Sequence, residues 1–558
     1  MAETPRQPTR SGTPPWPDEF AARYTAAGYW DGRSLGEHLY AAADLRPDTV
    51  CLVDGDVRLT FAQLMARADG AALRLRALGL RADDRVILQL ANCWEFVAMT
   101  VACLRLGVVP VMALPANRRQ EIAAVAAHVQ AVALIVPTST RDFDLQAMAA
   151  EIAAEQDGIA HVLVLGDKVL PGHVDVTALL APAEDPAAAR ARLDATPPAG
   201  QDVALFLMTG GTTGMPKLVA RTHDDFGFMA RRAAEICQVG PGSVYLAALP
   251  LGHGFPMSGP GVLGTLMAGG RAVIAATPAP ERAFPLIARE RVTLTSLVPA
   301  IIQRWLEYRE SDPDTDLSSL LAIQSGGARL PEHVTRGVEP VLGCRLQQVY
   351  GMSEGLLCLT RPDDPDEVVW HTQGRPICVD DELVLVDEDG EPAPAGAPGV
   401  LLTRGPYTPR GYYRAEGLNA HSHAGGWYRT GDIVRIRPDG NVVVEGRDKD
   451  VINRGGEKIP AEEIENVAHQ LPGVRMAAAV AMPDAELGER ICLYAVAHTG
   501  HQVTLDDVRN AMETVGLARF KLPERLVLVG ELPVTNVGKI DKKALRSDIA
   551  QRIAAEAA

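Results

Sequence analysis

Short apolar runs alternate with longer amphipathic segments along roughly the first 350 residues of the chain. Runs such as DRVILQL (84–90) and AVALIVP (131–137) have the length and composition of buried strands. Segments such as FAQLMARADGAALRLRALGL (61–80) instead repeat their apolar residues at helical spacing. The same alternation returns around SVYLAAL (243–249) and LTSLVP (294–299). It predicts βαβ units and an α/β fold built on two largely parallel sheets.

The pattern changes between residues 380 and 446, where short β-rich runs are joined by Asp-Gly and Pro-Gly turns. This stretch predicts a small β-subdomain attached to the two sheets. A domain boundary is expected at about residue 447, which gives an N-terminal domain over 1–446 and a small C-terminal domain over 447–558.

The C-terminal domain has a mixed pattern of its own. A helix is expected from about Pro460, strands at VRMAAAVAMPD (474–484) and ICLYAVAHT (491–499), and a last helix near 505–515. These elements predict a compact α+β unit.

Composition narrows the class of protein. The chain has 558 residues and a formal net charge of −16, so it lacks the basic surface that nucleic-acid binding needs. Its eight cysteines form no C-x-x-C pair, which indicates free thiols in a cytoplasmic protein. The Pro-rich start (1–20) is expected to be a loose tail rather than a signal peptide, and the apolar stretch 97–116 to be a buried helix and strand rather than a membrane span.

A Gly/Thr-rich loop, MTGGTTGMPK (208–217), follows the apolar run DVALFL. Small residues let backbone N–H groups approach phosphate oxygens, while threonine hydroxyls and Lys217 add hydrogen bonds and charge. It is not a Walker P-loop, because Met-Pro separates Gly214 from Lys217 and no Ser or Thr follows the lysine.

This loop resembles the phosphate loop of the acyl-adenylate-forming superfamily of acyl-CoA synthetases, luciferases and nonribosomal adenylation domains. Further matches follow in the family's order at YGMSEG (350–355), YRTGD (428–432), GRDKDVINRGGEKIPAEEIE (446–465) and PVTNVGKIDKKALR (533–546). The resemblance implies an enzyme that uses ATP and Mg²⁺ to activate a carboxylic acid as its acyl-AMP, and then passes the acyl group to a thiol.

The resemblance also implies which residues hold the nucleotide. Glu354 matches the magnesium-binding carboxylate, Asp432 the residue that accepts both ribose hydroxyls, and Arg447 supports the same sugar. Tyr350 matches the aromatic plate under adenine. The remaining expected nucleotide contacts are backbone or hydroxyl groups of Thr209, Gly210, Gly211, Thr212, Thr213, Gly214, Gly327 and Gly351.

The C-terminal motifs match the moving parts of the family. Lys539 corresponds to the adenylation lysine, which together with Lys217 and His253 makes up the expected catalytic set. Lys449 occupies the hinge position, and Gly455 and Gly456 would line the thiol tunnel after the C-terminal domain rotates.

Within the superfamily, the chain most resembles the stand-alone ligases for dihydroxybenzoate or salicylate, in RTHDDFGFMARRAAEICQV (221–239), YLAALPLGHGFPMSGPGVLGTLMAGG (245–270) and INRGGEKIPAEEIE (452–465). The expected wall residues of the acyl pocket are His253, Gly254, Phe255, Met257, Gly259, Gly326 and Ala328. Gly254 cannot neutralise a substrate ammonium, which disfavours amino acids. Gly254 and Gly259 replace the family's usual Asn and Ser, which removes hydrogen bonds to ring hydroxyls and opens space. We therefore predict a bicyclic aryl acid, such as a naphthoate or quinoline carboxylate, with 2,3-dihydroxybenzoate or salicylate as the alternative.

Two other interpretations also fit the sequence. GMSEG (351–355) also fits the G-x-S-x-G elbow of α/β-hydrolases, with Ser353 as nucleophile, although an elbow should open a helix. A non-catalytic binding protein is a third class. The acceptor thiol is expected to come from outside the chain, from coenzyme A or from the phosphopantetheine of a separate carrier protein.

Overall fold

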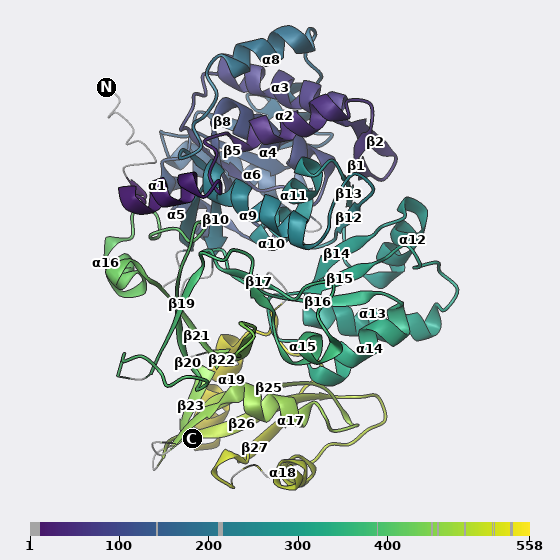
Figure 1. The fold of residues 1–558 in the computed structure, drawn as a ribbon, viewed down its shortest axis with the longest axis vertical. Coiled ribbons are helices and arrows are strands. Elements are labelled where there is room, and N and C mark those ends of the chain that lie inside the picture. The colour runs from purple at the N-terminus through teal and green to yellow at the C-terminus, as the bar shows by residue number, and fades with distance from the viewer. Residues whose placement is uncertain are drawn as a thin grey trace.

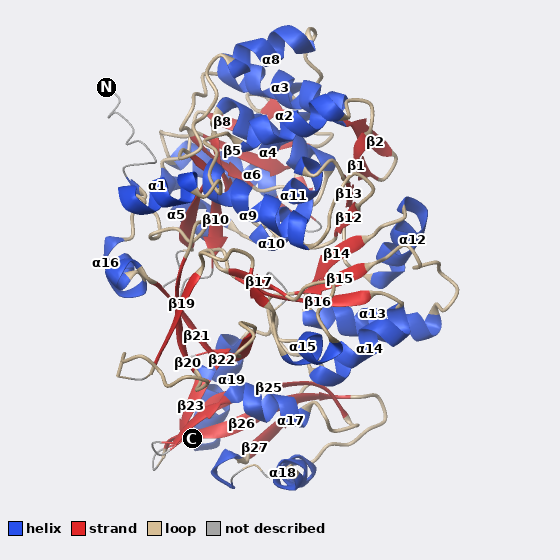
Figure 2. Ribbon diagram, in the orientation of Figure 1, coloured by secondary structure: helices blue, strands red, loops and turns tan. Residues whose placement is uncertain are grey.

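Two large and mostly parallel sheets form the N-terminal part of the molecule (Figures 1 and 2). The computed structural model describes residues 12–140, 143–209, 216–387, 389–447, 450–454, 457–484, 487–515, 517, 519–535 and 539–557. Over this part of the chain, the larger sheet has nine strands in the order β18 (Arg375–Pro376), β17 (Leu357–Leu359), β16 (Arg345–Gly351), β15 (Ala322–Ser325), β14 (Leu294–Leu297), β12 (Val244–Ala247), β13 (Arg271–Ile274), β1 (Val50–Asp54) and β2 (Val57–Thr60). The smaller sheet has seven, in the order β11 (Lys217–Thr222), β10 (Val203–Thr209), β4 (Val109–Met112), β3 (Arg85–Leu88), β5 (Ala133–Pro137), β8 (His161–Leu165) and β9 (Val174–Asp175). The predicted α/β fold class is confirmed.

Helices pack on both faces of each sheet. The apolar core between the sheets includes α2 (Leu35–Leu45), α3 (Phe61–Ala77), α4 (Trp94–Leu106), α9 (His223–Ile236) and α11 (Gly261–Met267). The other face of the larger sheet is covered by α12 (Pro280–Glu290), α13 (Pro299–Ser311) and α14 (Glu332–Leu342), and that of the smaller sheet by α5 (Arg119–Val129) and α6 (Leu145–Glu155). Strands such as β4 are apolar throughout because both of their faces are covered.

Local sequence signals explain the helix ends. Thr60 caps α3 in a reciprocal capping box with Gln63. Gly107 ends α4 with a φ of 78°, a backbone conformation that glycine adopts without steric cost. The apolar stretch 97–116 therefore folds as a helix followed by β4, as predicted.

The β-rich stretch forms a separate antiparallel sheet in the order β19 (Glu382–Val386), β20 (Gly399–Arg404), β21 (Tyr428–Ile436) and β22 (Val442–Arg447). The sheet that follows in sequence contains β23 (Val451–Arg454), β24 (Glu457–Pro460), β25 (Val474–Asp484), β26 (Gly488–Ala497) and β27 (Arg525–Leu528). It is accompanied by α17 (Ala461–Ala468), α18 (Leu505–Thr514) and α19 (Lys542–Ala557). This smaller α+β part lies at the bottom of Figure 1.

One prediction for this part is wrong: α18 is not the last helix, because α19 follows it. Leu545 and Ile549 lie one helical turn apart and are buried beside Tyr494 of β26. That i, i+4 pair was the available signal, but the polar Lys, Arg, Asp and Gln residues around it obscured the pattern.

The expected loose tail is also only partly correct. From residue 12 onward the segment is packed against the fold, while residues 1–11 lie outside the described part of the chain. Trp16 contacts Tyr24 of α1 (Asp18–Ala26) and Trp30 edge to face, with ring centroids 5.9 and 4.9 Å apart. Packing of the Trp16 ring thus holds this segment against the fold, although its Pro-rich composition is typical of a loose tail.

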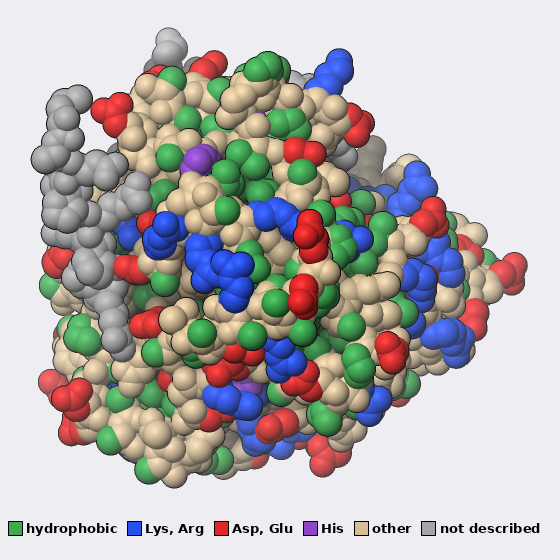
Figure 3. Space-filling model, turned by 90° about the horizontal axis from the view of Figure 1, so that it is seen from above, with side chains coloured by type: hydrophobic (Ala, Val, Ile, Leu, Met, Phe, Trp, Pro, Cys, Tyr) green, Lys and Arg blue, Asp and Glu red, His purple; other side chains and the backbone are tan. Residues whose placement is uncertain are grey.

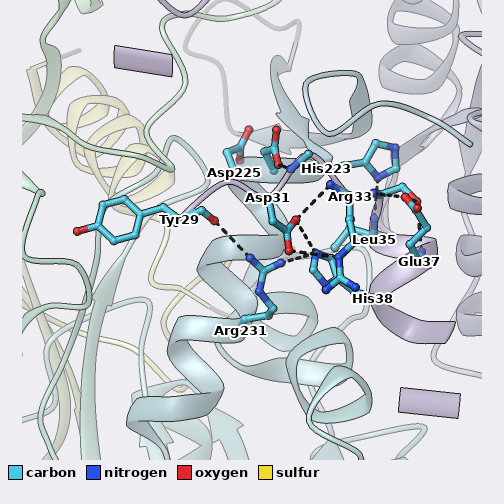
Figure 4. Close-up of polar contacts among 12 residues, drawn as sticks. Tyr29, Asp31, Arg33, Leu35, Glu37, His38, His223, Asp225 and Arg231 are labelled. Atoms are coloured by element: carbon cyan, nitrogen blue, oxygen red, sulfur yellow. Dashed lines mark hydrogen bonds and ion pairs between the residues drawn. The ribbon is translucent and has the colours of Figure 1, made fainter. Parts of the chain in front are cut away.

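A buried polar cluster ties this N-terminal segment to α9 (Figure 4). The Arg231 guanidinium lies 2.5 Å from Nε2 of His38 and donates to the Tyr29 carbonyl at 3.3 Å. The Leu35 N–H donates to Nδ1 of His223 at 3.1 Å. Burial and the charge of Arg231 lower the pKa of His38 to about 4, so its ring is neutral at pH 7.

The surface and the thiols agree with the composition. Acidic and basic side chains are interspersed over the described part of the face in Figure 3. All eight cysteines are free, and six of them are buried. None of the described helices is both long and apolar enough to span a bilayer.

The packing of α19 can be tested directly. Ile549→Ala should destabilise the C-terminal part by about 2–5 kcal/mol, because it leaves a cavity under a fully buried side chain. Gln551→Ala, at an exposed position of the same helix, should change stability by less than about 0.5 kcal/mol. Amide hydrogen exchange along β25 and β26 measures both; equal protection in the two variants would contradict the packing.

Candidate active site

The two ends of the Gly/Thr loop are fixed by strand pairing. Thr209, at the end of β10, is the register partner of Lys217 at the start of β11. The expected phosphate contacts Gly210, Gly211, Thr212, Thr213 and Gly214 lie outside the described residues. The Lys217 ammonium lies 4.8 Å from the centre of the Tyr412 ring. Oγ1 of Thr209 is buried without a hydrogen-bond partner in the structure.

Tyr412 also links this lysine to the expected metal carboxylate. Its hydroxyl donates to Oε1 of Glu354 at 2.7 Å and lies 3.4 Å from the Tyr428 hydroxyl. Glu354 sits in the turn between β16 and β17 and keeps its remaining lone pairs for a ligand. Lys217 and Glu354, 137 positions apart in the chain, thus share one aromatic partner.

The same turn excludes the hydrolase interpretation. A nucleophile elbow needs a strand, a sharp turn and then a helix. Here β16 is followed by the turn and by strand β17, which pairs antiparallel with it. The Ser353 carbonyl instead accepts a hydrogen bond from Arg221 at 3.0 Å.

Arg221 is a residue that the motif analysis missed. Its side chain is fully buried and pairs with Asp225 at 2.6 Å, one turn along α9. It also donates to the Tyr407 carbonyl at 3.2 Å, so a single guanidinium joins β11 to two loops around Glu354. No local motif marks it, because its acceptors are backbone carbonyls far away in sequence.

Asp432 is held by two partners from different elements. The register of β21 and β22 places it opposite Arg447, whose Nε lies 2.9 Å from Oδ1. Oδ2 accepts a hydrogen bond from the Tyr350 hydroxyl at 2.8 Å. Burial and the Asp432 charge raise the pKa of Tyr350 well above its usual value, so it remains a donor. Each carboxylate oxygen still has a lone pair to offer to a hydroxyl.

Lys539 reaches this group from the C-terminal part. Its Cε would lie 3.2 Å from a Cβ added to Gly327, which has a φ of 90°. Burial and the charge of Arg447 lower the pKa of Lys539, while Asp432 and Glu354 act in the opposite direction. The structure therefore brings Lys539 to the residues expected to bind the nucleotide.

The expected acyl wall begins at α10 (Gly254–Ser258). His253 caps this helix, its Nδ1 accepting from the Phe255 N–H at 3.2 Å. Burial and the nearby Lys539 ammonium lower the pKa of His253 to about 4, so the ring is neutral at pH 7. His253 therefore lies between the lysine and the aryl-acid residues.

The glycines of this wall do not simply open space. A Cβ added to Gly326 would lie 2.7 Å from the Phe255 ring, and one added to Gly259 would lie 3.3 Å from it. The partly buried Phe255 ring therefore lies against both glycines. A Cβ at Gly254 would meet Leu207 at 3.0 Å.

Two other wall predictions have different outcomes. Met257, which the resemblance places in the wall, is 1% exposed and packs in the core between the sheets. Ala328 is exposed beside Gly327. The predicted hinge Lys449 and tunnel residues Gly455 and Gly456 lie outside the described residues.

These residues fit ATP and Mg²⁺. The hydroxyls of Thr209 and Ser325 are buried without partners in the structure, which suits donors that await phosphate or acyl oxygens. Lys217 and Lys539 supply positive charge, and Glu354 an oxygen ligand of the kind that Mg²⁺ prefers. Gly351 lies at the exposed end of β16, where an added Cβ would lie 2.8 Å from the Leu357 side chain.

Comparison with known proteins gives one consistent result. The family described as AMP-binding enzyme matches residues 39–413, and its C-terminal domain family matches residues 463–539. A 2-hydroxy-7-methoxy-5-methyl-1-naphthoate–CoA ligase of Streptomyces carzinostaticus is 59% identical over 98% of this chain and 99% of its own. A salicylyl-CoA synthase/salicylate adenylyltransferase of a Streptomyces species is 54% identical over 96% of this chain and 98% of its own.

A solved structure agrees with these relatives. The apo structure of MbtA from Mycobacterium smegmatis superimposes with a TM-score of 0.73 at 41% identity, covering 97% of this chain and 99% of that one. The likeness extends over both the N-terminal sheets and the C-terminal part.

The carboxylate of Asp432 provides a test of the nucleotide site. Asp432→Asn preserves the shape but leaves Arg447 without its ion pair and weakens acceptance from ribose hydroxyls. ATP affinity measured by calorimetry should fall about 10- to 100-fold, the range for losing charged hydrogen bonds. Asp439→Asn, in an exposed turn of the same sheet, should bind normally; equal affinities in both variants would place the nucleotide elsewhere.

Proposed function

Because the chain belongs to the AMP-binding enzyme family, we propose that it activates a bicyclic aryl carboxylic acid with ATP and transfers the resulting acyl group to the thiol of coenzyme A. The ligase class and the activation of an aryl acid follow from the family and its relatives. The observation that carries the proposal is the meeting of Lys539 with Gly327, Asp432 and Glu354 beside an apolar wall.

In the first step, a carboxylate oxygen of the aryl acid attacks the α-phosphorus of ATP. The bond to the bridging oxygen breaks, and the electron pair leaves with pyrophosphate. We assign Lys539 to the negative charge that develops at the α-phosphate and carboxylate, and Lys217 to the departing phosphates. Mg²⁺ held by Glu354 would supply further neutralisation of the phosphate charge. No proton moves in this step, so a neutral His253 can orient the carboxylate without acting as a base.

In the second step, the thiolate attacks the acyl carbon of the aryl-AMP. The bond from this carbon to the phosphate oxygen breaks, AMP leaves with the electron pair, and the thiol proton passes to solvent. Lys539 must withdraw to admit the thiol. We propose that the C-terminal part turns about Lys449 and brings Gly455 and Gly456 to the thiol path, with the domain boundary at 447.

The pocket disfavours amino acids, and support for a bicyclic acid comes from a relative. The described wall residues around Phe255 include no carboxylate that could pair with a substrate ammonium, and His253 is neutral. The Streptomyces carzinostaticus relative is by name a naphthoate–CoA ligase. Salicylate, in the name of the second relative, is the alternative substrate.

Support for coenzyme A as the acceptor comes from the same two relatives, whose names both specify a CoA product. A carrier-protein thiol reacts by the same chemistry and is the alternative. Product analysis with coenzyme A or a carrier protein separates the two.

Lys539 tests the proposed reaction. Lys539→Ala should slow acid-dependent ATP–pyrophosphate exchange by about 10²- to 10³-fold, because it removes charge from a preorganised and buried site. ATP should still bind, since Asp432 and Arg447 remain. Lys543→Ala, at an exposed position, is the matched control; normal exchange in Lys539→Ala would refute the assignment.

Gly326 tests the substrate class. Pyrophosphate exchange should be faster with hydroxynaphthoates than with salicylate or 2,3-dihydroxybenzoate. In Gly326→Ala the new Cβ displaces the Phe255 ring, and kcat/KM for a naphthoate should fall about tenfold or more relative to salicylate. Adding Phe255→Leu should restore the ratio. Faster exchange with 2,3-dihydroxybenzoate than with every bicyclic acid would overturn the bicyclic assignment while leaving the ligase intact.

A further inference from the structure

An ion pair joins the loop beside the acyl site to the C-terminal part of the molecule. Nη1 of Arg329 lies 3.6 Å from Oε1 of Glu462, with side chains that are 24% and 17% exposed. Arg329 follows the strand β15 of the larger sheet, whereas Glu462 lies in the first turn of α17. The contact therefore crosses between the two parts of the molecule.

The Arg329 end is connected to the reaction centre. Arg329 lies in the same loop as Gly327, the glycine that packs against Lys539. Its guanidinium also donates to the Val444 carbonyl of β22 at 3.3 Å, three residues before Arg447. A displacement of Arg329 would therefore also shift the loop that faces Lys539.

The Glu462 end depends on Arg329 for charge compensation. Oε1 of Glu462 is buried and accepts no hydrogen bond from the described residues. Lys542 also attracts this carboxylate, but its ammonium lies 2.7 Å from Glu465, while Glu465 and Glu445 repel it. Burial raises the pKa of Glu462 to about 7 even though Arg329 acts to lower it, so losing Arg329 would make the charge of this carboxylate still more costly.

Two further contacts between the described residues of this interface are neutral. The Gln303 side chain donates to the Arg475 carbonyl at 3.1 Å, and the rings of His333 and His469 lie 6.3 Å apart. Such contacts add shape complementarity at the interface. An ion pair differs from them, because it is partly desolvated in one arrangement of the two parts and rehydrated in another. It can therefore shift the equilibrium between the two arrangements.

We propose that Arg329 and Glu462 are positioning residues that hold the C-terminal part in the arrangement with Lys539 inserted. The pair must separate before the C-terminal part can rotate for thiol attack. It thereby favours the adenylation half-reaction over the thioester half-reaction, and this inference rests on the proposed function.

The test separates the two half-reactions. Arg329→Gln, Glu462→Gln and the double variant are assayed for pyrophosphate exchange and, with purified aryl-AMP supplied, for thioester formation. Each single variant should lose about tenfold in the kcat of exchange with little change in the KM for ATP, and should form thioester from aryl-AMP as fast as the parent or faster. The double variant should lose no more than either single one, because both remove the same interaction.

Matched controls distinguish this role from a general loss of structure. Arg329→Lys keeps the charge and should retain most of the exchange activity. Arg304→Gln removes a pair with Glu281 at 2.8 Å that lies wholly within the N-terminal part, and should behave as the parent. Equal losses in both half-reactions, additive losses in the double variant, or full exchange activity in the single variants would each overturn the proposal.

Lys539→Ala keeps the two proposals apart. If this variant retains exchange, the proposed function fails. If it loses exchange while Arg329→Gln and Glu462→Gln do not, only the positioning role fails.

Discussion

A lysine ammonium buried beside an arginine is the constraint around which the site is organised. Burial and Arg447 both disfavour the charged form of Lys539, and the carboxylates of Asp432 and Glu354 compensate only in part. The positive charges of Lys539 and Arg447 then equal the negative charges of Asp432 and Glu354, so the group has no net negative charge. A polyanionic nucleotide adds negative charge, so the inserted position of Lys539 becomes most favourable when substrate is present.

The scaffold supplies these charges from segments that are distant in sequence. Antiparallel pairing of β21 and β22 sets Asp432 opposite Arg447, and β16 presents Tyr350 to the same carboxylate. Arg221 fixes the turn that carries Glu354 through the Ser353 carbonyl, and its own charge is balanced by Asp225. Buried pairs of this kind add little net stability but are costly to break on one side, which makes them suited to holding a geometry.

Much of this arrangement could be predicted from the sequence. Periodicity located the alternating strands and helices of the two sheets, because buried parallel strands are apolar throughout and their helices are amphipathic. The motifs around Glu354, Asp432 and Lys539 identified the residues that the structure brings together. What the sequence did not reveal was made by tertiary contacts: the role of Arg221 depends on carbonyl acceptors 132 and 186 positions away, and α19 depends on a surface supplied by β26.

The acyl wall shows why residue identity alone is an incomplete guide to pocket size. Glycine at 259 and at 326 suggests a larger cavity, yet close packing fills the space beside a missing side chain with a neighbouring one where it can. Here the neighbour is the Phe255 ring, which lies against both glycines and is only partly buried. The glycines therefore act by letting an aromatic ring approach the backbone closely. The size of acid that fits is set by the position of that ring, which is a property of packing rather than of any single residue.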